Sequence, residues 1–273
     1  MIIKPFPKSF LYTPAINIKN LFKTEMLHAD VSVIDLEDSI PKHKKEAARL
    51  SLIEFSERKG FKPIKAVRIN SIRKRDGLED VIWMVNNKWT PDIIIMTMVE
   101  DPAEIIILKN ILSELADQSN IYVTIETPLA INRILEIAAV SDGLIFGSAD
   151  LAATLGVNIT WDNMFYARSK IVIAAANYNI PSIDTACYLM DAMDSLTAES
   201  KKAREMGFTG KAAIHPSQLG IINSTFTSNE EELSHAKLIV TEFEKNKDEI
   251  IKINGQMIGP PFYLKAKKIL ARI

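Results

Sequence analysis

Residues 92–99 read DIIIMTMV. Nearly all of these side chains are apolar, whereas polar and apolar residues would alternate in a half-exposed strand. A short run of this kind is typical of a strand buried on both faces, as in a parallel sheet. Further β-rich runs lie at residues 10–15, 31–38, 65–70, 121–127, 143–148, 182–187 and 210–215. The sequence therefore predicts eight strands, and the count of eight depends on the short seventh and eighth runs.

Segments with helical patterns separate most of these runs, at residues 17–28, 43–59, 101–116, 129–140, 163–178 and 195–206. Asp101-Pro102 is a suitable N-cap followed by proline at the first helical position, and Gly207 is a suitable C-cap. Strands that alternate with helices favour a closed (β/α)8 barrel of the α/β class over an open doubly wound sheet. The length of 273 residues suits one barrel, which typically has about 250.

The last part of the chain departs from this alternation. Residues 229–246 form a charged helical pattern, and residues 253–258 contain the turn signal Asn254-Gly255. Gly259-Pro260-Pro261 then interrupts the chain before a final basic helix that ends at Ile273. We therefore predict a barrel over residues 1–226 and a helical extension over residues 227–273. The extension either packs on a neighbouring subunit or is a plain C-terminal addition.

The composition excludes several classes of protein. The 33 basic and 34 acidic residues leave a net charge of -1, which argues against a general nucleic-acid binder. Cys187 is the single cysteine, so no internal disulfide forms and a reducing compartment is expected. The start, MIIKPFPKSF, has no apolar signal region, and no apolar run reaches membrane-spanning length. We expect a cytoplasmic protein without a nucleic-acid or membrane partner.

Polar side chains occur at the carboxyl ends of the predicted strands, where barrel enzymes place their active sites. They are Asp35, Glu37, Asp38, Arg68, Glu126, Asp150, Asp184 and His215. Glu126 and Asp150 follow the adjacent fifth and sixth strands, so the two carboxylates should lie close together. A Mg²⁺ ion between them would relieve their repulsion, with water and substrate oxygens as its other ligands. The alternative is a salt-bridged structural role for the two carboxylates.

Arg68 lies between two apolar residues of the third strand. Its guanidinium suits a carboxylate or an enolate oxygen, because it can donate two parallel hydrogen bonds. The alternative for Arg68 is a structural ion pair with Glu37 or Asp38. These two acidic residues would either hold Arg68 in place or bind a water molecule at the metal. His215 suits a general base, although capping before Pro216 is the favoured role. Cys187 fits a small core residue, because no His–Asp pair is evident near it.

Six motifs in series resemble the citrate lyase β-subunit-like branch of the HpcH/HpaI aldolase superfamily, over about residues 9–273. They are VIDLEDSI (33–40), KAVRIN (65–70), VTIETPLAI (123–131), IFGSADLAATLG (145–156), YARSKIVIAA (166–175) and GFTGKAAIHPSQ (207–218). The resemblance implies a Mg²⁺-dependent carbon–carbon lyase that cleaves or forms a β-hydroxyacyl-CoA such as citryl-, malyl- or citramalyl-CoA. The other product would be a 2-oxo acid. It also implies a homo-oligomer, a trimer or hexamer, whose extension reaches over a neighbour's site.

The resemblance also implies residue roles. The metal ligands fall on Glu126 and Asp150, and the substrate-binding arginine on Arg68, while Glu37 and Asp38 complete the catalytic set. We further expect four residues to contact the substrate, namely Gly147, Ser148, Ala149 and Asp184.

Three positions depart from the family pattern. Ala149 stands where an acidic residue often precedes the metal aspartate, and Met96-Thr97 replaces a Pro-Lys pair. Gly259 replaces an aspartate that acts as acid or base in members with a complete tail. Asp38, Asp184 or water at the metal would then have to move the proton. Two alternatives follow: an aldolase or synthase acting on a free acid or carrier-protein thioester, and a catalytically weakened homologue that serves as a binding or assembly subunit.

Overall fold

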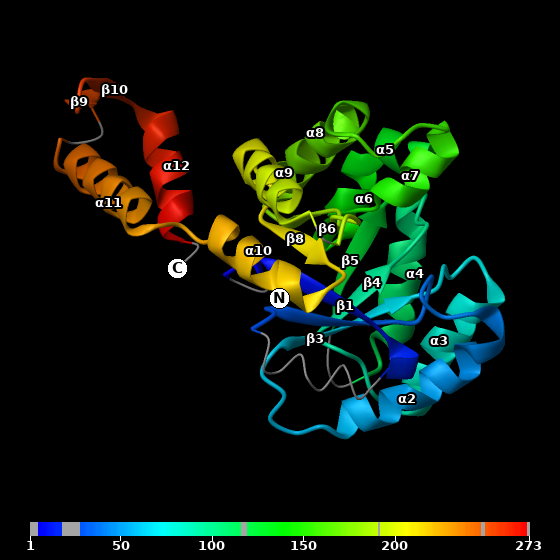
Figure 1. Ribbon diagram of the computed structural model, residues 1–273. Coiled ribbons are helices and arrows are strands. Elements are labelled where there is room, and N and C mark those ends of the chain that lie inside the picture. Colours follow the sequence, from blue (N-terminus) through cyan, green and yellow to red (C-terminus); the bar gives the residue numbers. More distant parts are fainter. Residues whose placement is uncertain (1–4, 18–27, 116–118, 191, 247–248, 272–273) are drawn as a thin grey trace.

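A computed structural model of the chain describes residues 5–17, 28–115, 119–190, 192–246 and 249–271 (Figure 1). Eight parallel strands close into a barrel in sequential order, with β1 hydrogen-bonded to both β2 and β8. The strands are β1 (Ser9–Pro14), β2 (Val31–Asp35), β3 (Ile64–Ile69), β4 (Ile93–Met96), β5 (Asn120–Ile125), β6 (Gly143–Phe146), β7 (Ser182–Asp184) and β8 (Gly210–Ala213). The predicted (β/α)8 barrel is confirmed, including its short seventh and eighth strands.

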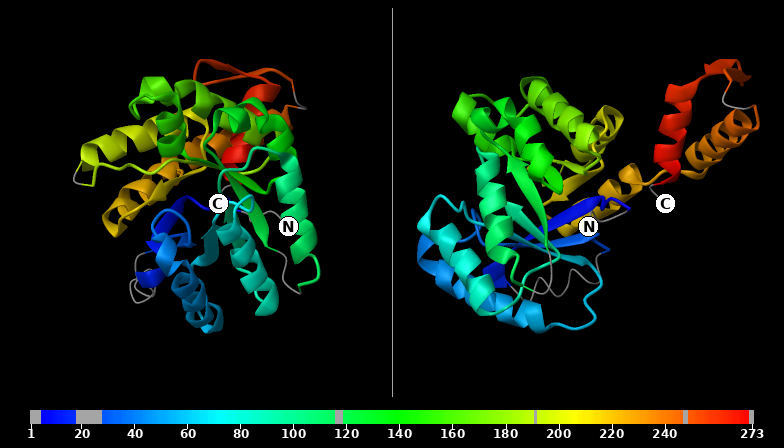
Figure 2. Two further views of the ribbon diagram at one scale, coloured as in Figure 1. Left: turned by 90° about the vertical axis from the view of Figure 1, so that its right-hand side faces the viewer. Right: turned by 180° about the vertical axis from the view of Figure 1, so that it is seen from behind.

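Helices surround the barrel (Figures 1 and 2). They are α2 (Lys45–Glu57), α3 (Arg75–Asn86), α4 (Pro102–Leu112), α5 (Pro128–Asn132), α6 (Ile134–Val140), α7 (Ser148–Leu155), α8 (Trp161–Tyr178), α9 (Met193–Met206) and α10 (Leu219–Phe226). The predicted caps are confirmed, since Asp101 and Glu104 form a capping box on α4 and Gly207 ends α9 with φ of 111°. α3, α7 and α10 have no counterpart among the helices predicted from the sequence. The helix expected over residues 17–28 falls almost wholly outside the described residues.

Several strands end earlier than the sequence suggests. β2 ends at Asp35 instead of Asp38, and β4 ends at Met96 instead of Val99. The backbone beyond these points leaves the strand ladder and bonds elsewhere. The Glu37 N–H, for example, donates to the Asp35 carboxylate at 2.9 Å. Glu37 and Asp38 thus lie on a loop at the mouth of the barrel, while apolar side chains such as Val33, Ile95 and Tyr122 fill its interior.

The extension forms a small unit of its own. It comprises α11 (Glu230–Lys245), a hairpin of β9 (Ile251–Ile253) and β10 (Gln256–Ile258), and α12 (Pro260–Leu270). Phe243 stacks on Tyr263 with ring centroids 4.9 Å apart, within a separate apolar cluster. The Asn254-Gly255 turn is confirmed, as both residues have positive φ. The extension lies beyond the amino ends of the strands, away from the barrel mouth (Figure 1).

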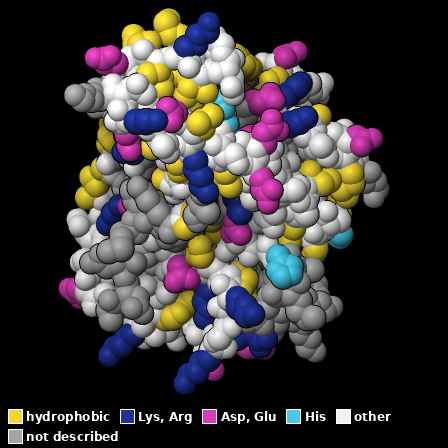
Figure 3. All heavy atoms as spheres, turned by 90° about the vertical axis from the view of Figure 1, so that its left-hand side faces the viewer, with side chains coloured by type: hydrophobic (Ala, Val, Ile, Leu, Met, Phe, Trp, Pro, Cys, Tyr) yellow, Lys and Arg dark blue, Asp and Glu magenta, His cyan; other side chains and the backbone are white. Residues whose placement is uncertain are grey.

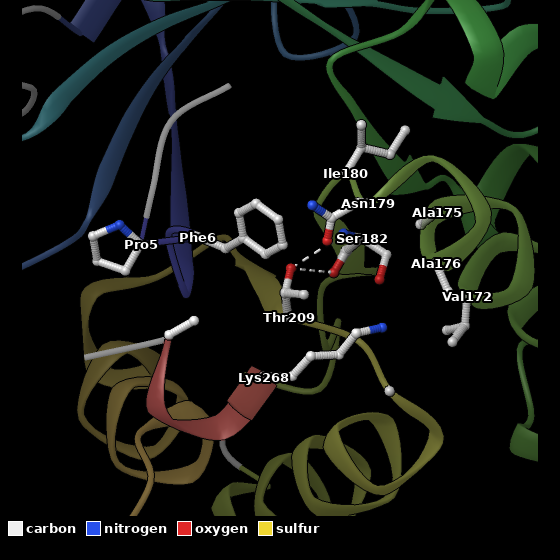
Figure 4. A pocket seen from close by; sticks show the side chains of 12 residues that line it. Pro5, Phe6, Val172, Ala175, Ala176, Asn179, Ile180, Ser182, Thr209 and Lys268 are labelled. Atoms are coloured by element: carbon white, nitrogen blue, oxygen red, sulfur yellow. Dashed lines mark hydrogen bonds between the residues drawn. The ribbon is translucent and has the colours of Figure 1, made fainter. Parts of the chain in front are cut away.

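A cavity of about 130 Å³ lies at the base of the barrel, beside the end of α12 (Figure 4). Thr209 bonds there to the backbone of Ser182, and Lys268 extends along one side. The described residues that line this cavity include no carboxylate. The described lining of this cavity therefore lacks the carboxylate ligands by which proteins commonly hold Mg²⁺.

Candidate active site at the carboxyl ends of the strands

A larger cavity, of about 420 Å³, opens at the other end of the barrel. Residues at or just after β1, β2, β3, β5, β6, β7 and β8 line it. Its charged lining residues are Asp35, Asp38, Arg68, Glu126 and Asp150. Of the residues predicted to form the site, the structure thus brings Arg68, Asp38, Glu126, Asp150, Gly147 and Ala149 to one cavity.

Arg68 is held in a fixed orientation by Asp35. Its Nε and Nη2 atoms each donate to one oxygen of the Asp35 carboxylate at 2.7 Å. Burial opposes the charge of Asp35, but the bonds from Arg68 outweigh it and hold the pKa of this carboxyl below its usual range. The ring of Tyr12 lies 5.3 Å from the guanidinium carbon. The sequence analysis placed Asp35 at a strand end but assigned it no partner.

The remaining nitrogen of Arg68 faces the acidic pair after β2. Nη1 lies 3.1 Å from Glu37 Oε2 and 3.9 Å from Asp38 Oδ2. Burial raises the pKa of Glu37 to about 7, and the charge of Asp38 adds to this effect while Arg68 opposes it. The raised pKa places the ionisation of Glu37 near neutral pH; Glu37 contacts Arg68 but does not itself line the cavity.

Glu126 is almost completely buried at the end of β5, with 3% of its surface exposed. Its Oε1 accepts a 2.6 Å hydrogen bond from the N–H of Met98, a residue whose φ of 56° lies in the left-handed region. Gly147 leaves the space that the Glu126 side chain occupies, because a Cβ there would lie 2.6 Å from Glu126 Oε2. Burial, together with the charge of Asp150, raises the pKa of Glu126 to about 8 despite the Met98 bond.

Asp150 lies in the first turn of α7, a half-buried position on the same cavity. Burial raises its pKa, and the charge of Asp38 adds to the shift. The first N–H groups of a helix have no partner within the helix, so the start of α7 also offers donors to an anion. Ser148 does not line the cavity, which corrects its expected contact with substrate: its buried hydroxyl bonds to Thr185 at 2.8 Å.

Two carboxylates with raised pKa values beside one cavity are suited to a hard divalent cation. Mg²⁺ takes oxygen ligands and is commonly held by one or two carboxylates together with water and substrate. No cluster of three or more His, Cys, Asp or Glu side chains with metal-binding geometry occurs in the described part of the chain. Glu126 and Asp150 therefore fit a site in which water and a ligand complete the coordination.

Asp184 does not line this cavity, which corrects its expected contact with substrate. Its carboxylate is fully buried and bonds to Arg168 Nε at 2.8 Å and to Lys211 Nζ at 2.7 Å. Alternation along β7 explains the difference, since Ile183 belongs to the barrel interior and Asp184 therefore points outward, towards the helices. The two cations hold the pKa of Asp184 below its usual value against the effect of burial.

Other lining residues were missed by the sequence analysis, among them Tyr12, Thr124, Thr185 and Tyr188. The period of two along each strand is the signal that indicates them, because Thr124 and Glu126 face the same side of β5. The buried hydroxyl of Thr124 has no hydrogen-bond partner among the described residues, so it is available to a ligand.

Two further residues have the structural roles favoured from the sequence. The Nδ1 atom of His215 bonds to Ser217 at the start of a short 3-10 helix, Pro216–Gln218, and His215 does not line the cavity. Cys187 is buried, with 2% of its surface exposed. Neither residue contributes a nucleophile or a base to the barrel mouth.

Residues 8–216 match the family model of the HpcH/HpaI aldolase/citrate lyase family. The chain belongs to this family. A relative, the mitochondrial citramalyl-CoA lyase of Rattus norvegicus, is 27% identical over 96% of this chain and 85% of its own length. RipC from Yersinia pestis is 33% identical in sequence, with a TM-score of 0.74 over 83% of this chain and 98% of its own.

A structure of the citrate lyase β subunit of Mycobacterium tuberculosis contains oxaloacetate and magnesium. It is 25% identical to this chain, with a TM-score of 0.72 over 84% of this chain and 100% of its own. The fold and the predicted family are thus confirmed. No helix among the described residues is long and apolar enough to cross a membrane.

Proposed function

We propose that this protein is a Mg²⁺-dependent carbon–carbon lyase that cleaves or forms a β-hydroxyacyl-CoA, such as citryl-, malyl- or citramalyl-CoA. The products of cleavage are a 2-oxo acid and an acyl thioester. The observation that carries the proposal is the pairing of Glu126 and Asp150 with Arg68 on one cavity. A metal site and a guanidinium in this arrangement suit a reaction that moves negative charge between a hydroxy acid and a thioester.

A divalent cation held by Glu126 and Asp150 would supply Lewis-acid stabilisation of oxygen charge at the hydroxy-acid end of the substrate. In cleavage, the hydroxyl group loses its proton and becomes the carbonyl of the oxo acid. The electrons of the broken carbon–carbon bond pass to the thioester, whose α-carbon then takes up a proton. Two kinds of residue are therefore needed, one that stabilises charge on the thioester oxygen and one that moves protons.

Arg68 is suited to the thioester oxygen. Asp35 orients the guanidinium through two bonds, and Nη1 faces the residues after β2. Fixed donors of this kind stabilise charge in a transition state without a reorganisation cost. Glu37, with its pKa of about 7, is suited to accept and return the proton near neutral pH. We assign Asp38 a supporting role, as its charge raises the pKa of both Glu37 and Asp150.

The carboxylate of the oxo acid is assigned to the start of α7. Gly147 and Ala149 line the cavity there, and the N–H group of Ala149, in the first turn of the helix, is an anion donor. Small residues at this turn allow a ligand to approach the backbone closely.

We also propose a cytoplasmic homo-oligomer, a trimer or hexamer, built from a barrel over residues 1–226 and an extension over residues 227–273. Apolar side chains of the extension support this, since Ile250, Met257 and Leu264 are 65%, 69% and 58% exposed. In Figure 3, which views the face with the extension, hydrophobic side chains lie among charged ones over the surface. Exposed apolar groups of this kind are typical of contact surfaces.

The proposal is tested by incubating the purified protein with Mg²⁺ and each of the three acyl-CoA substrates, and following free acetyl-CoA by chromatography. Turnover of at least one substrate is expected, with a loss of at least about 100-fold in Asp150→Asn and in Glu126→Gln. Glu54→Gln, at an exposed position of α2, is the matched control. Binding of Mg²⁺ and oxo acid without turnover of any thioester would instead indicate the binding or assembly subunit, while turnover of free acids alone would indicate an aldolase.

A further inference from the structure

The charged side chains of the described cavity lining lie on one arc of the barrel mouth. Asp35 and Asp38 follow β2, Arg68 is on β3, Glu126 follows β5 and Asp150 follows β6. All charged residues of the described cavity lining therefore belong to the arc from β2 to β6. This arc holds the metal pair and the guanidinium, the parts of the site that bind the reacting atoms.

The other arc, from β7 through β8 to β1, has no charged side chain among the described lining residues. β7 and the loop after it contribute Thr185, Ala186 and Tyr188, β8 and its end contribute Ala212 and Ile214, and β1 contributes Tyr12, Thr13 and Pro14. Of the polar groups here, the Thr185 hydroxyl is already bonded to Ser148. A substituent of the substrate that reaches this arc therefore meets methyl groups, aromatic rings and the neutral hydroxyls of Tyr12, Thr13 and Tyr188, but no cation among the described lining residues.

The cations near the charged arc have little capacity for a second carboxylate. Arg68 is the one cation among the described lining residues, and it already serves Asp35 and Glu37. Lys45 follows β2 but donates to two backbone carbonyls and to Asn70, at 2.7 to 2.8 Å, and does not line the cavity.

The charge balance of the cavity leads to the same conclusion. The described lining has four carboxylates and one guanidinium, so with all four carboxylates ionised around a bound divalent cation an excess of one negative charge remains. The first carboxylate of a ligand has the cation and the start of α7 to bind. A second carboxylate would enter an environment that remains negative and would lose its hydration without gaining a partner, which is costly.

We propose that the uncharged arc, with Ile214 at its rim, makes this site selective for 2-oxo acids that carry one carboxylate and a hydrogen or small alkyl group on the oxo carbon. Oxo acids with a second carboxylate bind more weakly. The inference rests on the proposed function, since it assumes that the oxo acid binds at Glu126 and Asp150. It restricts the acyl-CoA substrates to those whose hydroxyl-bearing carbon carries no carboxymethyl group.

The test is calorimetric titration of the full chain with pyruvate, 2-oxobutyrate and freshly dissolved oxaloacetate, each in saturating Mg²⁺ and without CoA. 2-Oxobutyrate is the matched probe for size, because its methyl group replaces the second carboxylate of oxaloacetate. We expect pyruvate and 2-oxobutyrate to bind at least about tenfold more tightly than oxaloacetate. Equal or tighter binding of oxaloacetate would overturn the inference and leave the proposed function intact.

A pair of variants at Ile214 tests the cause of the selectivity. Ile214 is 37% exposed, so a longer side chain has room at the rim. Ile214→Lys should raise the affinity for oxaloacetate relative to pyruvate about tenfold, whereas Ile214→Met, of similar length and without charge, should leave the ratio unchanged. An unchanged ratio in Ile214→Lys would contradict the role of the arc. Failure of all three oxo acids to bind the wild-type chain with Mg²⁺ would instead refute the proposed function.

Discussion

Substitution of Gly147 by alanine should damage the metal site without touching either proposed ligand. A Cβ at this position would lie 2.5 Å from Glu126 Cβ, 2.6 Å from Glu126 Oε2 and 2.8 Å from Thr124 Cγ2. Carbon and oxygen atoms in contact need well over 3 Å. Glu126 is 3% exposed and bonded to the Met98 N–H, so its side chain cannot move aside without breaking that hydrogen bond. The added methyl group must therefore displace the carboxylate or the β6–α7 turn.

Overpacking of a buried site typically costs about 1–3 kcal/mol. For a chain of this size, that free energy lowers the melting temperature by roughly 2–10 °C. The displacement also moves a ligand out of position, so we expect the affinity for Mg²⁺ to fall at least about tenfold, because metal sites require closely fixed ligands. Differential scanning calorimetry without metal measures the first effect, and calorimetric titration with Mg²⁺ measures the second.

Gly220→Ala is the matched control. Gly220 lies in α10 and an added Cβ there would meet no atom within 4 Å. Alanine is favoured over glycine inside a helix by about 1 kcal/mol, so this variant should be as stable as the wild type or more so, with unchanged Mg²⁺ binding. A Gly147→Ala protein with wild-type melting temperature and Mg²⁺ affinity would refute the reasoning, because the space beside Glu126 would then not be required.

Three further variants test other parts of the site. Arg68→Lys should lower kcat/KM at least about 100-fold with Mg²⁺ affinity nearly unchanged, because lysine cannot make the two parallel hydrogen bonds to Asp35. Steady-state kinetics measure this effect, and near-normal turnover would contradict it. In the wild type, kcat/KM should fall as the pH drops through about 7, where Glu37 takes up a proton. This fall should be absent from the pH–rate profile of Glu37→Gln. A fall that persists in the variant would exclude Glu37 as the base. Asp184→Asn should cost about 3–5 kcal/mol in denaturant unfolding near neutral pH, because it removes the buried carboxylate shared by Arg168 and Lys211 and leaves only Glu199, 3.5 Å from Lys211, as a negative partner among the described residues. Asp184 has a lower pKa in the folded than in the unfolded state, so its ionised form stabilises the fold above the unfolded-state pKa, and this stabilisation is lost as the pH falls through the folded-state pKa. The difference in unfolding free energy between wild type and variant should therefore shrink in acid. A difference that does not change with pH would contradict this.

Much of the fold follows from local patterns. Apolar runs separated by helical segments indicate a parallel sheet covered by helices, and the chirality of the connections permits few topologies. The Asp101 cap, the Gly207 stop and the Asn254-Gly255 turn lie where the sequence places them, because each depends on the conformation of a few neighbouring residues. The family motifs also predicted Glu126, Asp150 and Arg68 as site residues, and the structure places all three on one cavity.

The partners of these residues depend on strand register, which sequence does not contain. The β2–β3 pairing sets Asp35 opposite Arg68, so Asp35 became the main partner of the guanidinium instead of Glu37 or Asp38. The direction of the Asp184 side chain likewise could not be predicted from the sequence. Its type and its place in β7 suited a ligand contact, but the side of the strand that it faces follows from how the barrel closes. A shift of one residue along a strand turns every side chain to the opposite face of the sheet, and the packing of apolar side chains in the core selects between the two arrangements.

The sequence by itself thus determined a barrel, a strand-end site and the types of group in it. Local conformational preferences and hydrophobic periodicity depend on residues close together in the chain, so they can be predicted from the amino-acid sequence. The tertiary structure alone decided that Gly147 leaves room for Glu126, that Asp35 holds Arg68, and that all charged groups of the described lining lie on the arc from β2 to β6. These features join residues far apart in the chain, and they exist only once β8 pairs with β1 and closes the barrel.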